Sequence, residues 1–534
     1  MAKSSISPWT KLWNLLKLEK RDILHVLYYA LFAGLISLTL PLGIQAIINL
    51  IQGAEVSTSW ILLTCLVTLG VGFNGALQVL QLDLVENIQE KVFTRASFEF
   101  IYRFPKMRVR ELENYYPPEL SNRFFDVLTL QKGLQKLLLD FPAAVIQIIF
   151  GLLLLSFYHP FFIAFGILLV VLIYIIFKFS LSKAVDTSIL ESKKKYHVAF
   201  WIQQVAANFR TFKIFPDEYE QNKNNRLVQK YLEDRQAHFG TVKNQYKQMV
   251  VFKVIVTLGL LLIGGLLVLN QQMNIGQFVA AEIIIVLVIN SVEKIGLSLE
   301  TIYDVVTAVE KISEVTSKKI DRKTGVNNND VQLFPLKIEN LHIEKTTVPD
   351  LVVNEGDLIN IVGAEIVVND FFHYLSGMKK TKKGRIYFNR EEIANVNLDN
   401  YRNKIALLLN TDSIFEGTIW ENLTLSNPNM SSDRVYQMLE DFNVLDHINK
   451  LPESLNTYIF SGSKKIGAKT AKKICLIRAL LKDPKFLMIE KGYILSENDK
   501  QALMKHIKRE NTCVLLADDA HRLDEFEPLY LEQK

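Results

Sequence analysis

Cysteine is scarce in this chain of 534 residues, which contains only Cys65, Cys475 and Cys513. A disulfide framework needs an even set of cysteines at regular spacing, and a zinc site needs closely paired ligands. The three cysteines lie far apart in the sequence and meet neither condition. We therefore expect no disulfide scaffold and no metal site, and we expect these thiols to remain reduced on a cytosolic face.

A strong excess of one charge is also absent. The chain has 61 lysines and arginines against 56 aspartates and glutamates, a formal net charge of +5. The basic residues lie between apolar segments and do not form the concentrated basic face of a nucleic-acid-binding protein. We therefore expect no nucleic-acid partner. Residues 1–22 also lack the short apolar core and cleavage site of a signal peptide. We therefore expect them to form a cytosolic N-terminal segment without a removable signal, an orientation that the positive-inside rule supports.

Long apolar runs, by contrast, are abundant. Hydrophobic residues make up 49% of the chain and charged residues 22%, and the mean hydropathy is +0.15, so apolar and polar regions are segregated. A helix needs roughly 20 apolar residues to cross hydrocarbon. The sequence predicts an α-helical membrane domain of six transmembrane helices over residues 23–315. We place the helices near residues 23–51, 60–85, 137–158, 160–179, 250–269 and 278–297.

The connections between these stretches alternate in length and charge. The first, third and fifth links (around QGAEVSTS, YHP and NQQMN) are short and carry no lysine or arginine. The second and fourth links are long and basic. By the positive-inside rule, the long links and both termini face the cytosol.

The pattern changes after the last apolar stretch. Residues 316–335 have the charge and asparagine content of a linker. From Leu336, short strand-like runs such as LINIV, FLMIE and CVLLA alternate with helical segments. This alternation predicts an α/β domain with a largely parallel sheet over residues 336–534.

The turn after the run LINIV lacks the residues with which such a turn holds a phosphate. A loop of the form GxxxxGK[ST] uses glycine amides, a lysine and a hydroxyl to bind phosphates and metal. Aligned on Gly363, the second glycine, lysine and hydroxyl positions are Val368, Asn369 and Asp370. Valine resists the backbone angles of glycine, and Glu365 and Asp370 bring negative charge toward an anionic ligand. We expect magnesium-ATP to bind poorly or not at all, and we expect no resident cofactor.

Together these features resemble a half-size exporter of the ATP-binding cassette (ABC) superfamily, in which six membrane helices precede one nucleotide-binding domain. Four membrane-half segments carry the resemblance: LPLGIQAIIN, PPELSNRFFDV, NFRTFKIFPDE and NIGQFVAAEII. The resemblance implies that the second and third segments form coupling helices that press into the cassette. The candidate coupling residues are Glu119, Arg123, Asp126, Phe209, Lys213 and Glu218.

The cassette half resembles the family in its frame and departs from it at the functional motifs. Asn410 stands at the position of the Q-loop glutamine, before the well-matched FEGTIWENL. IGAKT, with Ile466 and Gly467, replaces the signature LSGGQ. In FLMIEKG, Glu490 and Lys491 replace the Walker B aspartate and the general-base glutamate. The family's ATP-dependent chemistry would therefore lack several contacts, and we expect no catalytic residue in this half.

The switch histidine of the family is also displaced. Asp519 stands at the expected spacing and His521 lies two residues later. The resemblance thus implies a degenerate ABC ATPase domain, built on an α/β P-loop-like fold. Lys491 could form an ion pair with Glu365 and Asp370 that replaces the nucleotide's charge, and the alternative is three exposed charges that never meet.

Polar side chains also occur within the predicted membrane helices. Asn74 and Gln78 lie on the second helix, and Glu282 and Asn290 lie on the sixth. Such groups usually face a bundle interior or a water-filled path, so they are candidates for a membrane pathway. For Glu282 the alternative is a side chain that reaches the outer interface or bonds a neighbouring helix.

The sequence therefore predicts a multi-pass subunit of an ABC exporter-like transport or secretion system in the bacterial inner (plasma) membrane, whose own cassette does not hydrolyse ATP. Its expected partner is a second ABC half-transporter, in a homodimer or a heterodimer. A periplasmic adaptor and an outer-membrane channel are further candidate partners. Two alternatives remain open: a non-transporting membrane scaffold or regulator, and a divergent but active ATP-driven homodimeric exporter.

Overall fold

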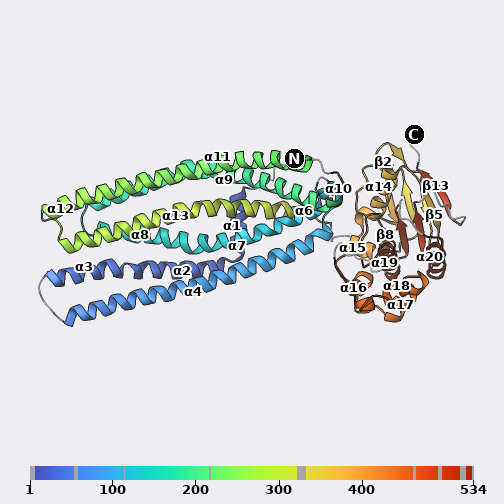
Figure 1. Ribbon diagram of the computed structural model, residues 1–534, viewed down its shortest axis with the longest axis horizontal. Helices are drawn as coiled ribbons and strands as arrows, with labels where there is room; N and C mark the ends of the chain where they lie inside the picture. Colours follow the sequence, from blue (N-terminus) through green and yellow to red (C-terminus); the bar gives the residue numbers. More distant parts are fainter. Residues whose placement is uncertain are drawn as a thin grey trace. The chain divides into compact units, whose positions relative to one another are not determined.

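The computed structural model contains two compact units, shown in Figure 1. It describes residues 7–52, 58–113, 115–215, 218–321, 332–460, 465–490, 496–517 and 525–531. The helical unit comprises Met1–Pro105 and Asn114–Lys318, and the C-terminal unit comprises Lys106–Glu113 and Lys319–Lys534. Each unit is described separately below.

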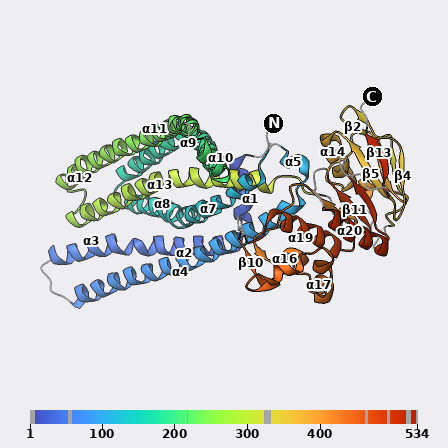
Figure 2. The ribbon, with the colours of Figure 1, turned by 45° about the vertical axis from the view of Figure 1, so that its right-hand side comes forward.

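Long helices that run side by side form the helical unit (Figures 1 and 2). The helix α13 contacts most of the others and is the central element. Short helices connect the long ones at the end where the long links lie. The helices are α1 (Pro8–Leu18), α2 (Lys20–Ser37), α3 (Thr39–Gln52), α4 (Thr58–Arg103), α6 (Pro117–Ser121), α7 (Asp126–Gln135), α8 (Phe141–Ser156), α9 (Phe161–Ala207), α10 (Phe209–Ile214), α11 (Tyr219–Gly259), α12 (Gly265–Leu269) and α13 (Ile275–Thr316).

Local chemistry explains two helix boundaries in this unit. The helix α2 ends at Ser37, four residues before Pro41, because a proline ring clashes with the carbonyl four residues earlier and supplies no N–H. The helix α13 begins with a capping box: the Asn274 side chain accepts the backbone N–H of Gln277 at 2.7 Å, and the Gln277 side chain accepts that of Asn274 at 2.9 Å. These paired bonds satisfy amides that a helix start leaves open.

Five helical segments of the described chain are long and apolar enough to cross a membrane. They are Lys20–Gln52, Thr58–Lys106, Pro117–Ser156, Tyr219–Leu269 and Ile275–Thr316. The remaining expected span, near residues 160–179, lies in the first part of α9, where the apolar stretch Phe161–Ile175 is shorter than the other five. The unit thus has several membrane-compatible helices, five of which reach full length.

Two sheets organise the C-terminal unit. The first has five parallel strands in the order β13 (Glu527–Leu531), β5 (Leu358–Gly363), β12 (Cys513–Leu516), β11 (Phe486–Ile489) and β8 (Ile405–Leu408). The second is antiparallel, in the order β4 (Leu351–Val353), β1 (Leu336–Glu339), β6 (Arg385–Phe388) and β7 (Glu391–Glu392). Apolar cores on the parallel sheet bury residues from the surrounding helices. These helices are α14 (Glu365–Leu375), α15 (Leu398–Asn403), α16 (Ile419–Thr424), α17 (Ser432–Asp441), α19 (Ala468–Leu481) and α20 (Glu497–Glu510).

A short segment of the first long link belongs to the C-terminal unit by its contacts. The Arg108 N–H donates to the Lys319 carbonyl at 3.1 Å, and the Asp321 N–H donates to the Lys106 carbonyl at 2.7 Å. The sequence analysis placed this segment within the membrane domain of residues 23–315. Most of the predicted linker, residues 322–331, lies outside the described residues.

Candidate functional site

The carboxyl ends of three parallel strands bring predicted site residues to one edge of the sheet. Gly363 ends β5, Glu490 follows β11 and Asn410 lies two residues beyond β8. In parallel sheets, ligands bind at this edge. The Asn410 N–H donates to Glu490 Oε2 at 2.7 Å, so the structure joins two positions that are 80 residues apart in sequence.

The turn between β5 and α14 is very short. Ala364 is the single residue between them, and its carbonyl accepts the N–H groups of Val367 and Val368 at 2.9 and 3.0 Å. Both valine side chains are buried in the apolar core. Two of the amides in this loop, those of Val367 and Val368, are therefore used in the first turn of the helix.

The space beside Gly363 is also filled. The strand β13 pairs with β5 as far as Gly363, which lies opposite Leu531. A Cβ added at Gly363 would lie 3.1 Å from both Cβ and the carbonyl oxygen of Leu531. Gly363 thus permits a close approach of two strands.

Asp370, at the hydroxyl position, has a cationic partner that the sequence analysis missed. Lys379 Nζ lies 2.6 Å from Asp370 Oδ1 and 3.7 Å from Glu113 Oε1. Burial is the largest single influence and lowers the pKa of Lys379, but the hydrogen bond to Asp370 and the negative charges of Asp370 and Glu113 together outweigh it, so the net shift is upward. Lys379 lies in the turn that follows α14, nine residues after Asp370. This spacing matches neither the helical nor the strand repeat, so the sequence pattern does not predict the contact.

His373 lies on α14 among these charges. Burial and then the positive charge of Lys379 lower its pKa, while Asp370 and Glu490 oppose the shift. Its Nδ1 atom is buried and lies 3.9 Å from Asp370 Oδ1, too far for a hydrogen bond. Among the described residues, Asn369 Oδ1 is likewise buried without a hydrogen-bond partner. We call Asp370, His373, Lys379, Asn410 and Glu490 the strand-end cluster.

The basic start of α19 reaches the same region. Lys472 Nζ donates to Asn410 Oδ1 at 2.9 Å, and Lys473 Nζ pairs with Asp499 at 2.7 Å. Gly467 is the N-cap of α19 and has no side-chain cap bond, while Ile466 packs against the neighbouring apolar core. Three predicted positions, Lys491, Asp519 and His521, lie outside the described residues.

The two sets of candidate coupling residues differ in their surroundings. Phe209, Lys213 and Glu218 lie at α10 and just beyond it and are exposed. Arg123 and Asp126, in contrast, are each only 6% exposed. The structure therefore places one set at the surface and holds the core of the other inside the helical unit.

A network of charges explains the burial of the second set. Arg123 contacts Glu119 at 2.7 Å and Glu314 at 3.0 Å, and its guanidinium lies 3.8 Å from the ring centre of Tyr196. The Tyr196 hydroxyl donates to Asp126 at 2.5 Å, and Lys311 contacts Glu314 at 2.8 Å. We call these six residues the inner ionic cluster. It joins α6, the turn before α7, the first residue of α7, α9 and α13.

The candidate pathway residues lie on two helices of the helical unit. Asn74 and Gln78 are on α4, and Glu282 and Asn290 are on α13. Gln78, Glu282 and Asn290 are exposed, and Asn74 Oδ1 is buried without a hydrogen-bond partner in the described part of the chain. The structure thus leaves three of these polar groups on the outer surface of a single subunit.

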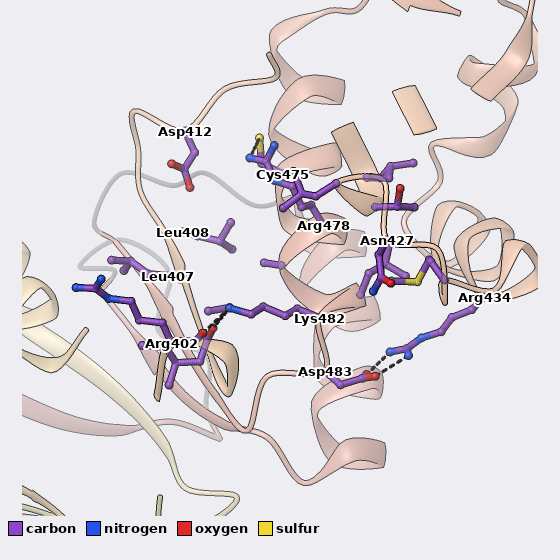
Figure 3. Close-up of a pocket in the computed structure, with 18 of the residues that line it drawn as sticks. Arg402, Leu407, Leu408, Asp412, Asn427, Arg434, Cys475, Arg478, Lys482 and Asp483 are labelled. Carbon is purple, nitrogen blue, oxygen red and sulfur yellow. Dashed lines mark hydrogen bonds and ion pairs between the residues drawn. The ribbon is translucent and has the colours of Figure 1, made fainter. Parts of the chain in front are cut away.

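A cavity of about 790 Å³ lies in the C-terminal unit, between β8, α19 and the connection from α16 to α17 (Figure 3). Its cations already have partners: Arg434 contacts Asp483 at 2.6 Å, and Lys482 donates to the Ile405 carbonyl at 3.0 Å. Burial lowers the pKa of Lys482. None of the described nucleotide-site positions predicted from the sequence lines this cavity, so it is separate from the strand-end cluster.

Comparisons with known proteins agree with this architecture. The sequence profile described as "ABC transporter transmembrane region" matches residues 23–292. A putative export ATP-binding/permease protein of Rickettsia bellii is 22% identical over 465 residues, which cover 83% of this chain and 79% of that protein. The ABC-type transporter MDR1 of Aureobasidium melanogenum is 28% identical over 181 residues, and the match spans only 13% of its length.

A solved structure is also similar to this chain in three dimensions. The chain superposes on a bacterial Atm1-family ABC exporter with ATP bound with a TM-score of 0.82 at 15% sequence identity. The match covers 96% of this chain and 94% of the other. At this identity the likeness establishes the fold.

Proposed function

Because this chain belongs to the ABC transporters and has their transmembrane region, we propose that it is an exporter subunit whose own C-terminal unit neither binds ATP tightly nor hydrolyses it. One observation carries this proposal. The helix α14 begins two residues after Gly363, so the residues at the phosphate-loop positions are helical and Val367 and Val368 are in the core. The first turn of α14 would have to unwind before its backbone amides could surround a phosphate.

The charges at the strand ends support the same conclusion. The position expected to carry the phosphate-binding lysine is Asn369, and Asp370 already has Lys379 as its cation. Glu490 is buried, and its Oε2 atom already accepts the backbone N–H of Asn410. Phosphoryl transfer depends on prepositioned positive charge and donors, and losing one such contact commonly costs on the order of 3 kcal/mol in the barrier.

In this proposal the chain acts with a second ABC half-transporter. The exposed α10, with Phe209, Ile214 and Phe215 at its surface, supports a docking role for the tip of the second long link. The basic long links support an orientation with both termini in the cytosol. An adaptor and an outer-membrane channel remain candidate partners of such an assembly.

Direct binding and turnover measurements on the purified full chain test the proposal. We expect radiolabelled magnesium-ATP to show no saturable binding up to about 1 mM, and we expect no vanadate-sensitive hydrolysis. Glu490→Gln is the matched control, because hydrolysis that survives in it comes from a contaminating ATPase. Saturable binding at micromolar concentrations, or vanadate-sensitive turnover that Glu490→Gln abolishes, would overturn the proposal.

A further inference from the structure

Two cations in the cavity of the C-terminal unit have no carboxylate partner in the described part of the chain. Arg478 lies in the last turn of α19, and Lys482 is the C-cap residue of that helix, four positions later (Figure 3). The Arg478 guanidinium donates to the Cys475 sulfur at 3.4 Å, and Lys482 donates to the backbone carbonyls of Arg402 and Ile405. Burial raises the pKa of the Cys475 thiol, which is therefore uncharged near neutral pH. Because none of these partners carries a full negative charge, both cations can attract an anion.

The acids of the cavity do not balance its cations. The lining residues include four cations and two acids. Arg434 is paired with Asp483 at 2.6 Å, and Arg402 is paired at 2.7 Å with Asp321, which lies outside the lining. The other acid of the lining, Asp412, accepts a backbone N–H at 3.0 Å and forms no ion pair with a described residue. Two cations thus face one unpaired acid, and the cavity keeps a net positive charge.

The remaining wall of the cavity is largely apolar. The strand β8 contributes residues 405–408, and the segment from α16 to α17 contributes Leu423, Leu425 and Met430. Sites for small molecules are mostly apolar with a few charged groups, and they commonly enclose about 300 to 1,000 Å³. The cavity, at about 790 Å³, matches such sites in size and in lining.

We propose that this cavity binds a small organic carboxylate with an apolar body. The carboxylate lies between Arg478 and Lys482, where the guanidinium donates two parallel hydrogen bonds and the ammonium acts as a point charge. The apolar body lies against Leu407, Leu423 and Met430, which line the cavity. The cavity shares no lining residue with the strand-end cluster, so failure of this proposal would leave the proposed function unchanged.

Titration calorimetry with 2-naphthoate tests the proposal on the full chain in lipid nanodiscs, after subtraction of empty nanodiscs. The isosteric 2-naphthamide is the uncharged comparison. We expect saturable binding of 2-naphthoate and binding of 2-naphthamide that is weaker by about tenfold or more, because the amide cannot pair with either cation.

Two variants test the charges of the cavity. Arg478→Gln should weaken 2-naphthoate by about tenfold and leave 2-naphthamide unchanged. Asn427 is exposed, lines the cavity and accepts the Asn429 N–H at 3.0 Å. Asn427→Asp keeps this acceptor and adds a negative charge, so it should also weaken 2-naphthoate alone, without altering the buried wall.

The matched control is Lys505→Gln, which removes a cation that is 79% exposed and lies outside the cavity, and it should keep the full affinity. An equal loss in Lys505→Gln and Arg478→Gln would show that overall charge is responsible. Absence of saturable binding, or equal binding of 2-naphthoate and 2-naphthamide, would overturn the proposal. If binding disappeared whenever the chain dimerised, the cavity would accommodate a segment of a second copy, and the small-molecule assignment would be wrong.

Competition with decanoate distinguishes two sources of such a carboxylate. Displacement of 2-naphthoate would show that the cavity accepts the acyl chain of a fatty acid. Failure to displace it would restrict the ligands to compact aromatic carboxylates, and either result supports carboxylate binding.

Discussion

The inner ionic cluster of the helical unit and the strand-end cluster of the C-terminal unit are both assemblies of charged side chains, but they are satisfied in different ways. In the inner ionic cluster, Arg123 contacts two carboxylates, one on α6 and one on α13. In the strand-end cluster, Asp370 has Lys379 and Glu490 has a backbone N–H. The contacts of the inner ionic cluster join separate helices of the bundle, whereas those of the strand-end cluster stay at one edge of the parallel sheet.

This difference indicates what each cluster can contribute. A buried cation shared by two carboxylates is costly to remove, because the acids left behind are poorly solvated. A charged side chain that already has a partner at the same sheet edge attracts a ligand less strongly. The comparison therefore assigns a structural role to the inner ionic cluster, and the contacts at the strand ends agree with the proposal that this edge does not hold a nucleotide.

Replacing Arg123 should have the largest effect. Arg123→Met leaves Glu119 and Glu314 without their shared cation, and we expect a loss of about 3 kcal/mol in the free energy of unfolding. Unfolding of the full chain in detergent, followed by temperature or denaturant, measures this loss. The matched control is Arg434→Met, whose pair with Asp483 is 35% and 49% exposed and should contribute less than about 1 kcal/mol. Equal losses in the two variants would place the inner ionic cluster among ordinary surface pairs.

Removing the Glu490 carboxylate should have an intermediate effect. Glu490→Leu leaves the Asn410 N–H without its acceptor, at a cost of about 2 kcal/mol, and should speed hydrogen exchange of the Asn410 amide. Asn410→Ala is the control, because it keeps that backbone bond and loses only the exposed contact with Lys472. Exchange mass spectrometry of peptides spanning residues 405–412 distinguishes the variants. If Asn410→Ala accelerated exchange as much as Glu490→Leu, the carboxylate would not be the anchor.

The sequence predicted much of the frame because the frame depends on periodic patterns. Apolar runs of membrane length gave the approximate positions of the long helices, and the runs LINIV, FLMIE and CVLLA correspond to β5, β11 and β12. The extent of the helices was less predictable. The helix α4 continues beyond the apolar run as far as Arg103. An apolar run marks the part of a helix that can cross the membrane, and it does not show how far polar residues continue the helix.

The contacts of the site residues were harder to predict. The resemblance placed Arg123 and Asp126 at a coupling tip, yet Tyr196, which contacts Asp126, and Glu314, which contacts Arg123, lie at least 70 residues away. Lys379 likewise reaches Asp370 through a turn whose geometry has no sequence period. Motif alignment located the strand-end positions, since these directly follow strands, but only the packing of α14 onto the sheet revealed what neutralises them.

The smallest expected effect concerns pH, and it depends on the mixed charges around His373. Burial and then the positive charge of Lys379 lower the pKa of His373 below its ordinary 6.5. The negative charges of Asp370, on α14, and Glu490, after β11, oppose this shift. The unfolded chain therefore binds this proton at higher pH than the folded chain does, and stability should fall as the pH drops below about 6.5. The slope contributed by one histidine is at most about 1.4 kcal/mol per pH unit.

The variant His373→Gln should flatten the pH dependence of the free energy of unfolding between pH 7.5 and 5.5. Unfolding is read from the fluorescence of Trp420, as the difference from a Trp420→Phe chain. The control His447→Gln, at an exposed histidine, should leave the pH dependence unchanged. If the slope were unaltered in His373→Gln, the strand-end cluster would accommodate the protonated imidazole of His373. The negative charges of Asp370 and Glu490 would then be less completely neutralised than their contacts imply.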